Sequence, residues 1–273
     1  MMIRNPASVL RSNTPISMEQ LRQVVPSAFA EEAHASRSDR YTFIPTAAVL
    51  TGLEREGFLP YAAMQQRVRQ DDRRDYTRHL IRFRHPGKAP AAIDDIIPEI
   101  VLLNSHDGSS SYRLMAGLFR LVCLNGLTVS EGTCAEVTVH HKGDVVGQVI
   151  EGAFQVLDDT AKAVDASQRF RRIALTDPEQ QAFGKAAAEL RWGEETPVEP
   201  EAVIRPRRPA DRAADLWTVF NRTQENILRG GLHGRTTTNR RMTTREVTGV
   251  AENVRLNRAL WTLTEQMARL KTA

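Results

Sequence analysis

The chain has 273 residues, of which 41% are hydrophobic and 26% are charged, enough apolar content for one large core or two modest ones. Its formal net charge is only +4, so basic residues bear on function only where they gather in one part of the chain. Two cysteines are too few for a disulfide framework, which favours a reduced, cytoplasmic protein. No segment reads as a signal peptide or a membrane span, so we expect no membrane association.

The first half of the sequence predicts a sheet with flanking helices. Amphipathic helices are expected at 17–25 and 46–56, the second preceded by Pro45 and closed by Gly57. Alternating or continuous apolar runs predict strands. These strands are 58–69, 77–85, 96–103 and 136–140.

The stretch from Asn104 to Gly126 predicts a tight turn and then a helix. Asp107-Gly108 is a turn dipeptide, and the serines after it would cap a helix N-terminus. Apolar residues then fall at positions i, i+4, i+7 and i+8, which is helical spacing: Leu114, Leu118, Leu121 and Val122. We therefore expect a strand–turn–helix unit whose helix packs on the apolar face of the sheet.

The second half predicts helices at 148–173, 176–192, 210–229 and 252–271. Residues 194–209 are rich in proline and charge and read as an exposed connector. The expected fold class is therefore α+β, an antiparallel-rich sheet with a packed central helix followed by a mainly helical second half. Residues 1–147 would form the α+β core and residues 148–273 the helical region, the two making separate domains or one integrated domain.

Basic residues are concentrated first between Arg67 and Lys88, where eight of them face three acidic residues. Alternation places several arginines on one face of the 77–85 strand. Such a face would bind a polyanion because guanidinium groups match phosphate oxygens, and nearby tyrosines could stack on unpaired bases. The candidate contacts are Arg67, Arg69, Arg78, Arg82 and Arg84. The alternative is a solvated strand face that is paired with neighbouring carboxylates.

A second basic segment spans 221–245, where six arginines face a single acid, Glu225. We expect 231–245 to be a flexible Gly/Thr/Arg loop that orders on nucleic acid. The candidate contacts here are Arg229, Arg235, Arg240, Arg241 and Arg245. A solubilising loop or a contact with an acidic protein face is the alternative.

The turn itself is a third candidate, as an anion or metal site beside a helix N-terminus. Its residues are Asn104, His106, Asp107 and Ser109, with His140 and His141 as further ligands. No paired-histidine, paired-cysteine or paired-carboxylate spacing supports a metal centre, and Asp or Asn in such a turn more often bonds its own backbone. No glycine loop precedes a helix to hold a nucleotide phosphate. We therefore expect a structural turn, no bound metal and no cofactor.

Several short motifs resemble a known family. They are Asn104–Ser110, Gly117–Cys123, Asn125–Leu127, Asn221–Asn226, Arg229–Gly231 and Asn257–Trp261. Together they span nearly the whole chain and resemble the YafZ/YfjQ-like proteins of plasmids and prophages, known as domain of unknown function 932. The resemblance implies a mobile genetic element, which favours DNA transactions, and it brings no established activity.

The leading hypothesis is a non-enzymatic DNA-binding protein that prefers single strands and acts in recombination. Its order of elements is compatible with single-strand annealing proteins, and assembly into a homo-oligomer would follow. A regulatory or anti-defence factor with an acidic protein partner is the first alternative. A metal-assisted hydrolase centred on His106 and Asp107 is the second, and it would need a positioned partner for the histidine.

Overall fold

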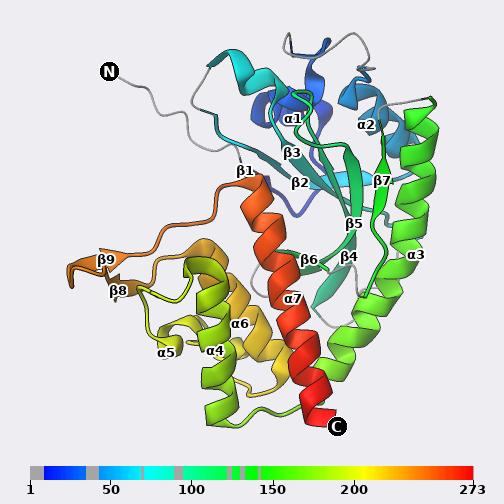
Figure 1. Ribbon diagram of the computed structural model, residues 1–273. Helices are drawn as coiled ribbons and strands as arrows, with labels where there is room; N and C mark the ends of the chain where they lie inside the picture. The colour runs from blue at the N-terminus through cyan, green and yellow to red at the C-terminus, as the bar shows by residue number, and fades with distance from the viewer. Residues whose placement is uncertain are drawn as a thin grey trace. The chain divides into compact units, whose positions relative to one another are not determined.

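The computed structural model describes residues 9–34, 43–68, 71–88, 95–121, 125–129, 133–140 and 143–272 (Figure 1). The chain forms two compact units. The first unit contains Met1–Phe119, Cys134–Ala161 and Thr248–Val250. The second contains Arg120–Thr133, Lys162–Val247 and Ala251–Ala273. Because the chain passes between them several times, no single cut in the sequence separates the two.

An antiparallel sheet organises the first unit. The strands are β1 (Val9–Arg11), β2 (Leu59–Gln65), β3 (His79–Arg84), β4 (Ile96–Asn104), β5 (Tyr112–Arg120) and β7 (Val137–Val139). They lie in the order β1-β2-β3-β4-β5, with β7 also paired to β5. The short strand β6 (Asn125–Thr128) falls in the second unit. The register joins apolar partners across neighbouring strands, such as Ile81 with Leu102 and Phe83 with Ile100. The strands expected at 58–69, 77–85, 96–103 and 136–140 are all present.

The helix expected after the Asp107-Gly108 turn is wrong, because residues Tyr112–Arg120 form strand β5. Eight of its nine residues are buried, which means that both faces of the strand are covered. A strand buried on both faces reads as a continuous apolar run, and such a run satisfies helical spacing by chance. Leu114 and Leu118 are therefore apolar because both are buried in this strand, and their spacing does not indicate a helix.

The helix that packs on this sheet is α3 (Val145–Arg171), whose first 17 residues belong to the first unit. Gly152 of α3 faces Leu114 of β5 and Val137 of β7 closely enough that a Cβ atom there would lie 2.9 and 2.7 Å from them. The second helix, α2 (Thr46–Arg55), meets α3 at Gly52, which faces Val146 and Ile150. Glycines thus let α3 approach the sheet on one side and α2 on the other.

The N-terminal helix α1 (Met18–Val24) begins with a reciprocal cap. Ser17 Oγ accepts from the backbone N–H of Gln20, and Gln20 Oε1 accepts from the backbone N–H of Ser17. Two 3₁₀ turns complete the unit, η1 (Pro26–Phe29) and η2 (Asp71–Tyr76). The helices expected at 17–25 and 46–56 are confirmed.

The second unit is mainly helical. Its elements are α4 (Asp177–Trp192), α5 (Pro200–Val203), η3 (Pro209–Asp211), α6 (Leu216–Arg229), the strands β8 (His233–Arg235) and β9 (Arg241–Thr243), and α7 (Val250–Thr272). Helix α6 is buried around nearly its whole circumference. Trp217 and Phe220 of α6 contact Trp261 of α7, with ring centroids 6.4 and 5.9 Å apart. The helical second half is therefore confirmed.

Two segments of this unit differ from expectation. The connector expected to be exposed at 194–209 folds onto the unit, since Val198 and Val203 are buried. The loop expected at 231–245 forms a two-stranded antiparallel hairpin, β8–β9. None of the helices in the described ranges is long and apolar enough to cross a membrane.

Gly152→Val should destabilise the protein, because the added methyl groups would press against Val137 and Leu114. Overpacking of this kind costs about 1–3 kcal/mol of unfolding free energy. Thermal and urea denaturation measure it, with Glu151→Val on the exposed face of the same helix as the control for β-branched helix propensity. Equal stability of the two variants would contradict the close approach of α3 to the sheet.

Candidate nucleic-acid interface

The arginines expected on a solvent-exposed sheet face are buried. Arg82 and Arg84 of β3 are 6% and 8% exposed, and both are paired with Glu99 of β4, which is fully buried. Arg82 Nη1 lies 3.3 Å from Glu99 Oε2, and Arg84 Nε lies 2.9 Å from Glu99 Oε1. Burial lowers the pKa of Arg82, and the charge of Glu99 opposes that shift. These two guanidinium groups therefore neutralise a buried carboxylate inside the sheet. The prediction that Arg82 and Arg84 lie on a solvent-exposed basic face is wrong.

Aromatic rings close this site further. The Arg84 guanidinium carbon lies 4.2 Å from the ring centroid of Tyr61 and 4.3 Å from that of Phe119. Cation–π contacts of this type are strongest where water is excluded. Tyr61 is thus engaged by an arginine of its own sheet, which argues against its stacking on a nucleic-acid base.

The other residues of the first basic set are scattered. Arg78 donates from Nε to Ser109 Oγ (3.1 Å) and from Nη2 to the Ser109 carbonyl (2.7 Å), so it holds the loop between β4 and β5. Arg67 is exposed beyond the end of β2, and Arg69 lies outside the described residues. The four described arginines of this set do not come together as one surface.

The Asn104–Ser111 turn is held by its own side chains. Asp107 Oδ1 accepts from the backbone N–H of Ser109 (2.9 Å), and Ser105 Oγ accepts from the backbone N–H of Ser110 (2.9 Å). Gly108 has φ +73°, which a glycine adopts without strain. The serines therefore close a strand–strand loop, where a helix cap was expected.

Behind this turn, two fully buried histidines belong to a polar network. His79 Nδ1 lies 3.0 Å from Ser27 Oγ, and His106 Nε2 lies 2.9 Å from Thr46 Oγ1. Asn104 Nδ2 also donates to Thr46 Oγ1 (3.0 Å). The described residues hold no group of three or more His, Cys, Asp or Glu side chains arranged to bind a metal ion. His140 is exposed and His141 lies outside the described residues, so the hydrolase hypothesis gains no support from this turn.

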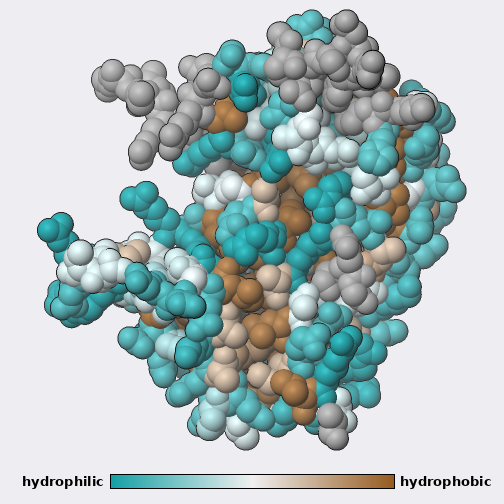
Figure 2. Space-filling model, in the orientation of Figure 1, coloured by the Kyte–Doolittle hydropathy of each residue, from teal (hydrophilic) through white to brown (hydrophobic). Residues whose placement is uncertain are grey.

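The β8–β9 hairpin carries the second basic set. Arg235, Arg240 and Arg241 of the hairpin are exposed, as is Arg245 two residues after β9, and no acidic residue lies between 231 and 245. In Figure 1 the hairpin projects from its unit as an arm, and in Figure 2 the same arm is mostly teal and white, with little brown. Among the residues that the structure describes, no carboxylate forms an ion pair with these four side chains.

The hairpin is built as a defined structure. Asn239 adopts φ +62° in its turn, and Thr236 N–H donates to the Arg240 carbonyl (2.9 Å). Arg235 N–H donates to the Pro197 carbonyl (2.8 Å), which ties the hairpin to the segment before α5. Gly234 is required at this tie, because a Cβ there would lie 1.9 Å from the Pro197 oxygen. The arginines are thus presented on an ordered scaffold and not on a loop.

Arg229, at the end of α6, differs from these four. Its Nη1 lies 2.9 Å from Glu225 Oε1, and Arg208 Nη2 lies 2.6 Å from the same oxygen. Glu225 is 1% exposed. Arg229 therefore stabilises the end of α6, unlike the exposed arginines of the hairpin, which have no carboxylate partner among the described residues.

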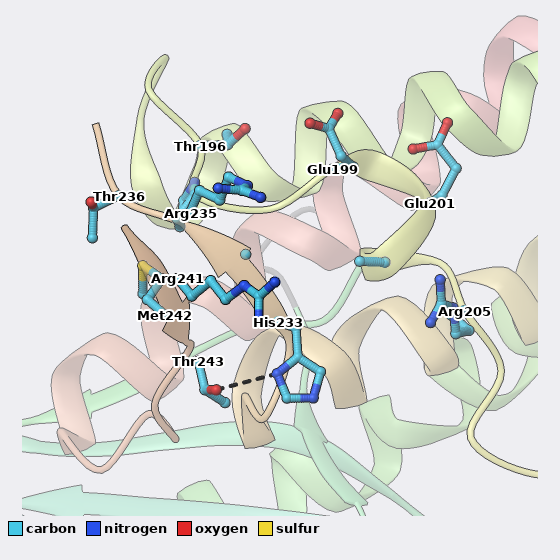
Figure 3. A pocket seen from close by; sticks show the side chains of 13 residues that line it. Thr196, Glu199, Glu201, Arg205, His233, Arg235, Thr236, Arg241, Met242 and Thr243 are labelled. Carbon is cyan, nitrogen blue, oxygen red and sulfur yellow. Dashed lines mark hydrogen bonds between the residues drawn. The ribbon is translucent and has the colours of Figure 1, made fainter. Parts of the chain in front are cut away.

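Together the hairpin and the 196–205 segment enclose an open groove of about 1080 Å³ (Figure 3). Arg241 extends from β9 into the middle of the groove, with His233 of β8 on one side and Arg205 at the far end. His233 Nδ1 lies 3.3 Å from Thr243 Oγ1. This groove was not expected from the sequence, because its walls are 28 or more residues apart in the chain.

Comparison with known proteins decides the family. A family model described as "Domain of unknown function (DUF932)" matches residues 33–261. The chain belongs to this family. It is 47% identical over 262 residues to the UPF0380 proteins YafZ and YfjQ of Escherichia coli K12, covering 96% of this chain and 94% of each relative. No solved structure matches.

The DUF932-like motif Asn221–Asn226 lies on the buried helix α6, and every one of its residues is at most 5% exposed. Asn226 Nδ2 donates to the carbonyls of Val203 (2.7 Å) and Arg205 (2.9 Å), which fixes one wall of the groove. Arg222 Nη1 donates to the Asp211 carbonyl (3.0 Å). The motif therefore positions the segments around the site, and its own side chains do not reach solvent.

Glu99→Ala should lower the unfolding free energy by about 3–5 kcal/mol, since it leaves two buried guanidinium groups without this carboxylate. Urea denaturation measures the change, with the exposed Glu194→Ala as control. For the same reason, charge reversal at Arg82 and Arg84 should unfold the protein and would say nothing about nucleic acid. A loss below about 1 kcal/mol in Glu99→Ala would contradict the burial of this pair.

Acid should destabilise the fold through His79. Burial, and secondarily the nearby charge of His106, lowers the pKa of His79 to about 3. Because an unfolded histidine titrates near 6.5, the unfolded chain binds the proton first, and stability falls as pH drops below that value. The slope for one proton is at most about 1.4 kcal/mol per pH unit.

Denaturation between pH 7 and pH 5 checks this expectation in wild type and in His79→Asn. The asparagine retains a polar group near Ser27 Oγ, the partner of His79 Nδ1, and it removes the titration. The variant should lose less stability on acidification than wild type. Parallel pH dependences would show that His79 is not the titrating group.

Proposed function

We propose that the protein binds nucleic acid, single-stranded DNA foremost, through the basic β8–β9 hairpin, and that it does so without catalysis. The observation that supports this most strongly is the set of exposed arginines Arg235, Arg240 and Arg241 on an ordered hairpin without acidic residues, with Arg245 exposed two residues after it. Guanidinium groups match phosphate oxygens, and neutralising phosphates releases condensed counterions.

The chemistry around the arginines also suits a phosphate backbone. Threonine hydroxyls lie beside them at Thr236, Thr237, Thr238 and Thr243, and hydroxyl donors commonly contact phosphate and sugar. The hairpin turn is fixed by its own hydrogen bonds, so little ordering entropy is lost when it binds. A role in the recombination of a mobile element would follow from single-strand binding, and a homo-oligomer would extend the interface along a strand.

The protein-partner alternative shares the same hairpin, since an acidic protein surface would also meet these arginines. The two differ in their dependence on salt. A polyanion releases counterions, so its affinity falls steeply and linearly on a log–log plot of binding constant against salt. An acidic protein partner would leave the protein with little affinity for oligonucleotides at physiological salt.

Arg240→Gln with Arg241→Gln should weaken binding to a fluorescein-labelled 20-nucleotide single strand, measured by fluorescence polarisation from 50 to 200 mM salt. Each lost phosphate contact should make the log–log slope shallower by about 0.7. Both side chains are exposed, so thermal stability should stay within the range of ordinary surface substitutions.

Arg172→Gln with Arg269→Gln is the matched control, because both arginines are exposed, lie in the same unit and remove the same charge. The control should keep a slope close to that of wild type. Equal losses in both double variants would indicate a nonspecific effect of net charge. The absence of binding by wild type at 50 mM salt would overturn the proposed function.

A further inference from the structure

The groove beside the hairpin carries carboxylates on one wall only, while cationic side chains come from the hairpin and from Arg205 at the far end of the other wall. Glu199 and Glu201 stand along the rim formed by α5 and the residue before it, while Arg241 and His233 come from the hairpin (Figure 3). Backbone bonds fix both walls, since Arg235 N–H donates to the Pro197 carbonyl and Asn226 holds the carbonyls of Val203 and Arg205. The spacing between the walls is therefore set by the fold.

The opposite charges of the groove do not pair with one another. Within the described part of the chain, neither Glu199 nor Glu201 comes within 4.0 Å of a basic nitrogen of Arg205, His233 or Arg241. These exposed carboxylates and cationic groups thus remain available to a ligand. The carboxylate acceptors therefore lie on the 196–205 wall alone, while cationic donors lie on the hairpin and, at Arg205, at the far end of the 196–205 wall.

A groove that served only to attract phosphates would be weakened by two carboxylates, because like charges repel the backbone. Carboxylates suit a nucleic acid only where they accept hydrogen bonds from base amino groups, as Glu and Asp do from the N4 amino group of cytosine. In a duplex one hydrogen of that amino group is engaged in base pairing and only the other is exposed, in the major groove, whereas in a single strand the whole Watson–Crick edge is open.

We propose that the groove receives the bases of a single strand, with Glu199 and Glu201 accepting hydrogen bonds from base amino groups while Arg241 and its neighbours hold the phosphates. This inference rests on the proposed function and adds a base preference to it. Cytosine, adenine and guanine carry an exocyclic amino group, and uracil and thymine carry none. The protein therefore discriminates against strands of uracil or thymine.

The test compares two 12-nucleotide strands at pH 7.5, one of deoxycytidine and one of deoxyuridine. Cytosine carries a 4-amino group where uracil carries a 4-oxo group, and neither base has the methyl group of thymine. Fluorescence polarisation at fixed salt gives the ratio of the two dissociation constants. One good hydrogen-bonded contact to a base predicts a preference of about fivefold for the cytosine strand in wild type. Using a ratio within each variant removes the general effect of protein charge.

Glu199→Gln with Glu201→Gln should bring that ratio close to one while overall affinity holds or rises, since two negative charges leave the groove. Glu194→Gln with Glu195→Gln is the matched control, because both residues are exposed, close in sequence and absent from the groove lining. This control should keep the wild-type ratio. Melting temperatures of both double variants should match wild type.

The outcomes separate the inference from the function beneath it. Binding by wild type with equal affinity for the two strands would overturn the base preference and leave the proposed function standing. A preference that persists in Glu199→Gln with Glu201→Gln would also overturn the role of these carboxylates. No binding of either strand at low salt would overturn the proposed function and this inference with it.

Discussion

The side-chain amide of Asn226 joins the three parts from which the candidate interface is made. Its Nδ2 holds the carbonyls of Val203 and Arg205 on the groove wall, and its Oδ1 accepts from Arg207 Nε at 2.6 Å. Arg207 in turn donates to the carbonyl of Gly230, where the chain leaves α6 for the hairpin. Asn226 is 1% exposed, so water does not reach this site. The amide therefore supplies hydrogen bonds that the buried backbone carbonyls would otherwise lack. One buried amide thus links the groove wall to the point where the chain leaves α6, and the bond from Arg235 N–H to the Pro197 carbonyl holds the hairpin itself.

The two sets of arginines show how burial decides the role of a charge. Arg82 and Arg84 lie in a central strand, where desolvation forces each guanidinium to meet a carboxylate or an aromatic ring. Arg240 and Arg241 lie on a two-stranded hairpin that has no second layer to bury them. The same residue type thus serves the interior of one unit and the surface of the other. Arg240 and Arg241 are therefore exposed to a partner, whereas Arg82 and Arg84 are not.

The sequence was sufficient for most elements and for the α+β class, because their apolar periods and end signals are local. It was insufficient at Tyr112–Arg120, where burial on both faces produced a continuous apolar run that also fits a helix. It was insufficient again at Arg82 and Arg84, since alternation shows that side chains share a face and not whether that face is covered. The pairing of Glu99 with both arginines depends on strand register, which no local pattern specifies.

The candidate site was predicted in part for the same reason. The charge of the 231–245 segment is visible in the sequence, whereas its hairpin depends on the tie between Gly234 and Pro197. A flexible arginine loop would bind any polyanion and lose entropy in doing so, and it would give little discrimination among bases. A fixed hairpin that faces Glu199 and Glu201 presents acceptors and cations at set positions, which is the requirement for reading a base edge. The hydrogen bond from Arg235 N–H to the Pro197 carbonyl holds the hairpin in place beside these carboxylates. This bond is therefore the feature on which the proposed base preference depends, whereas attraction of a polyanion alone would not require it.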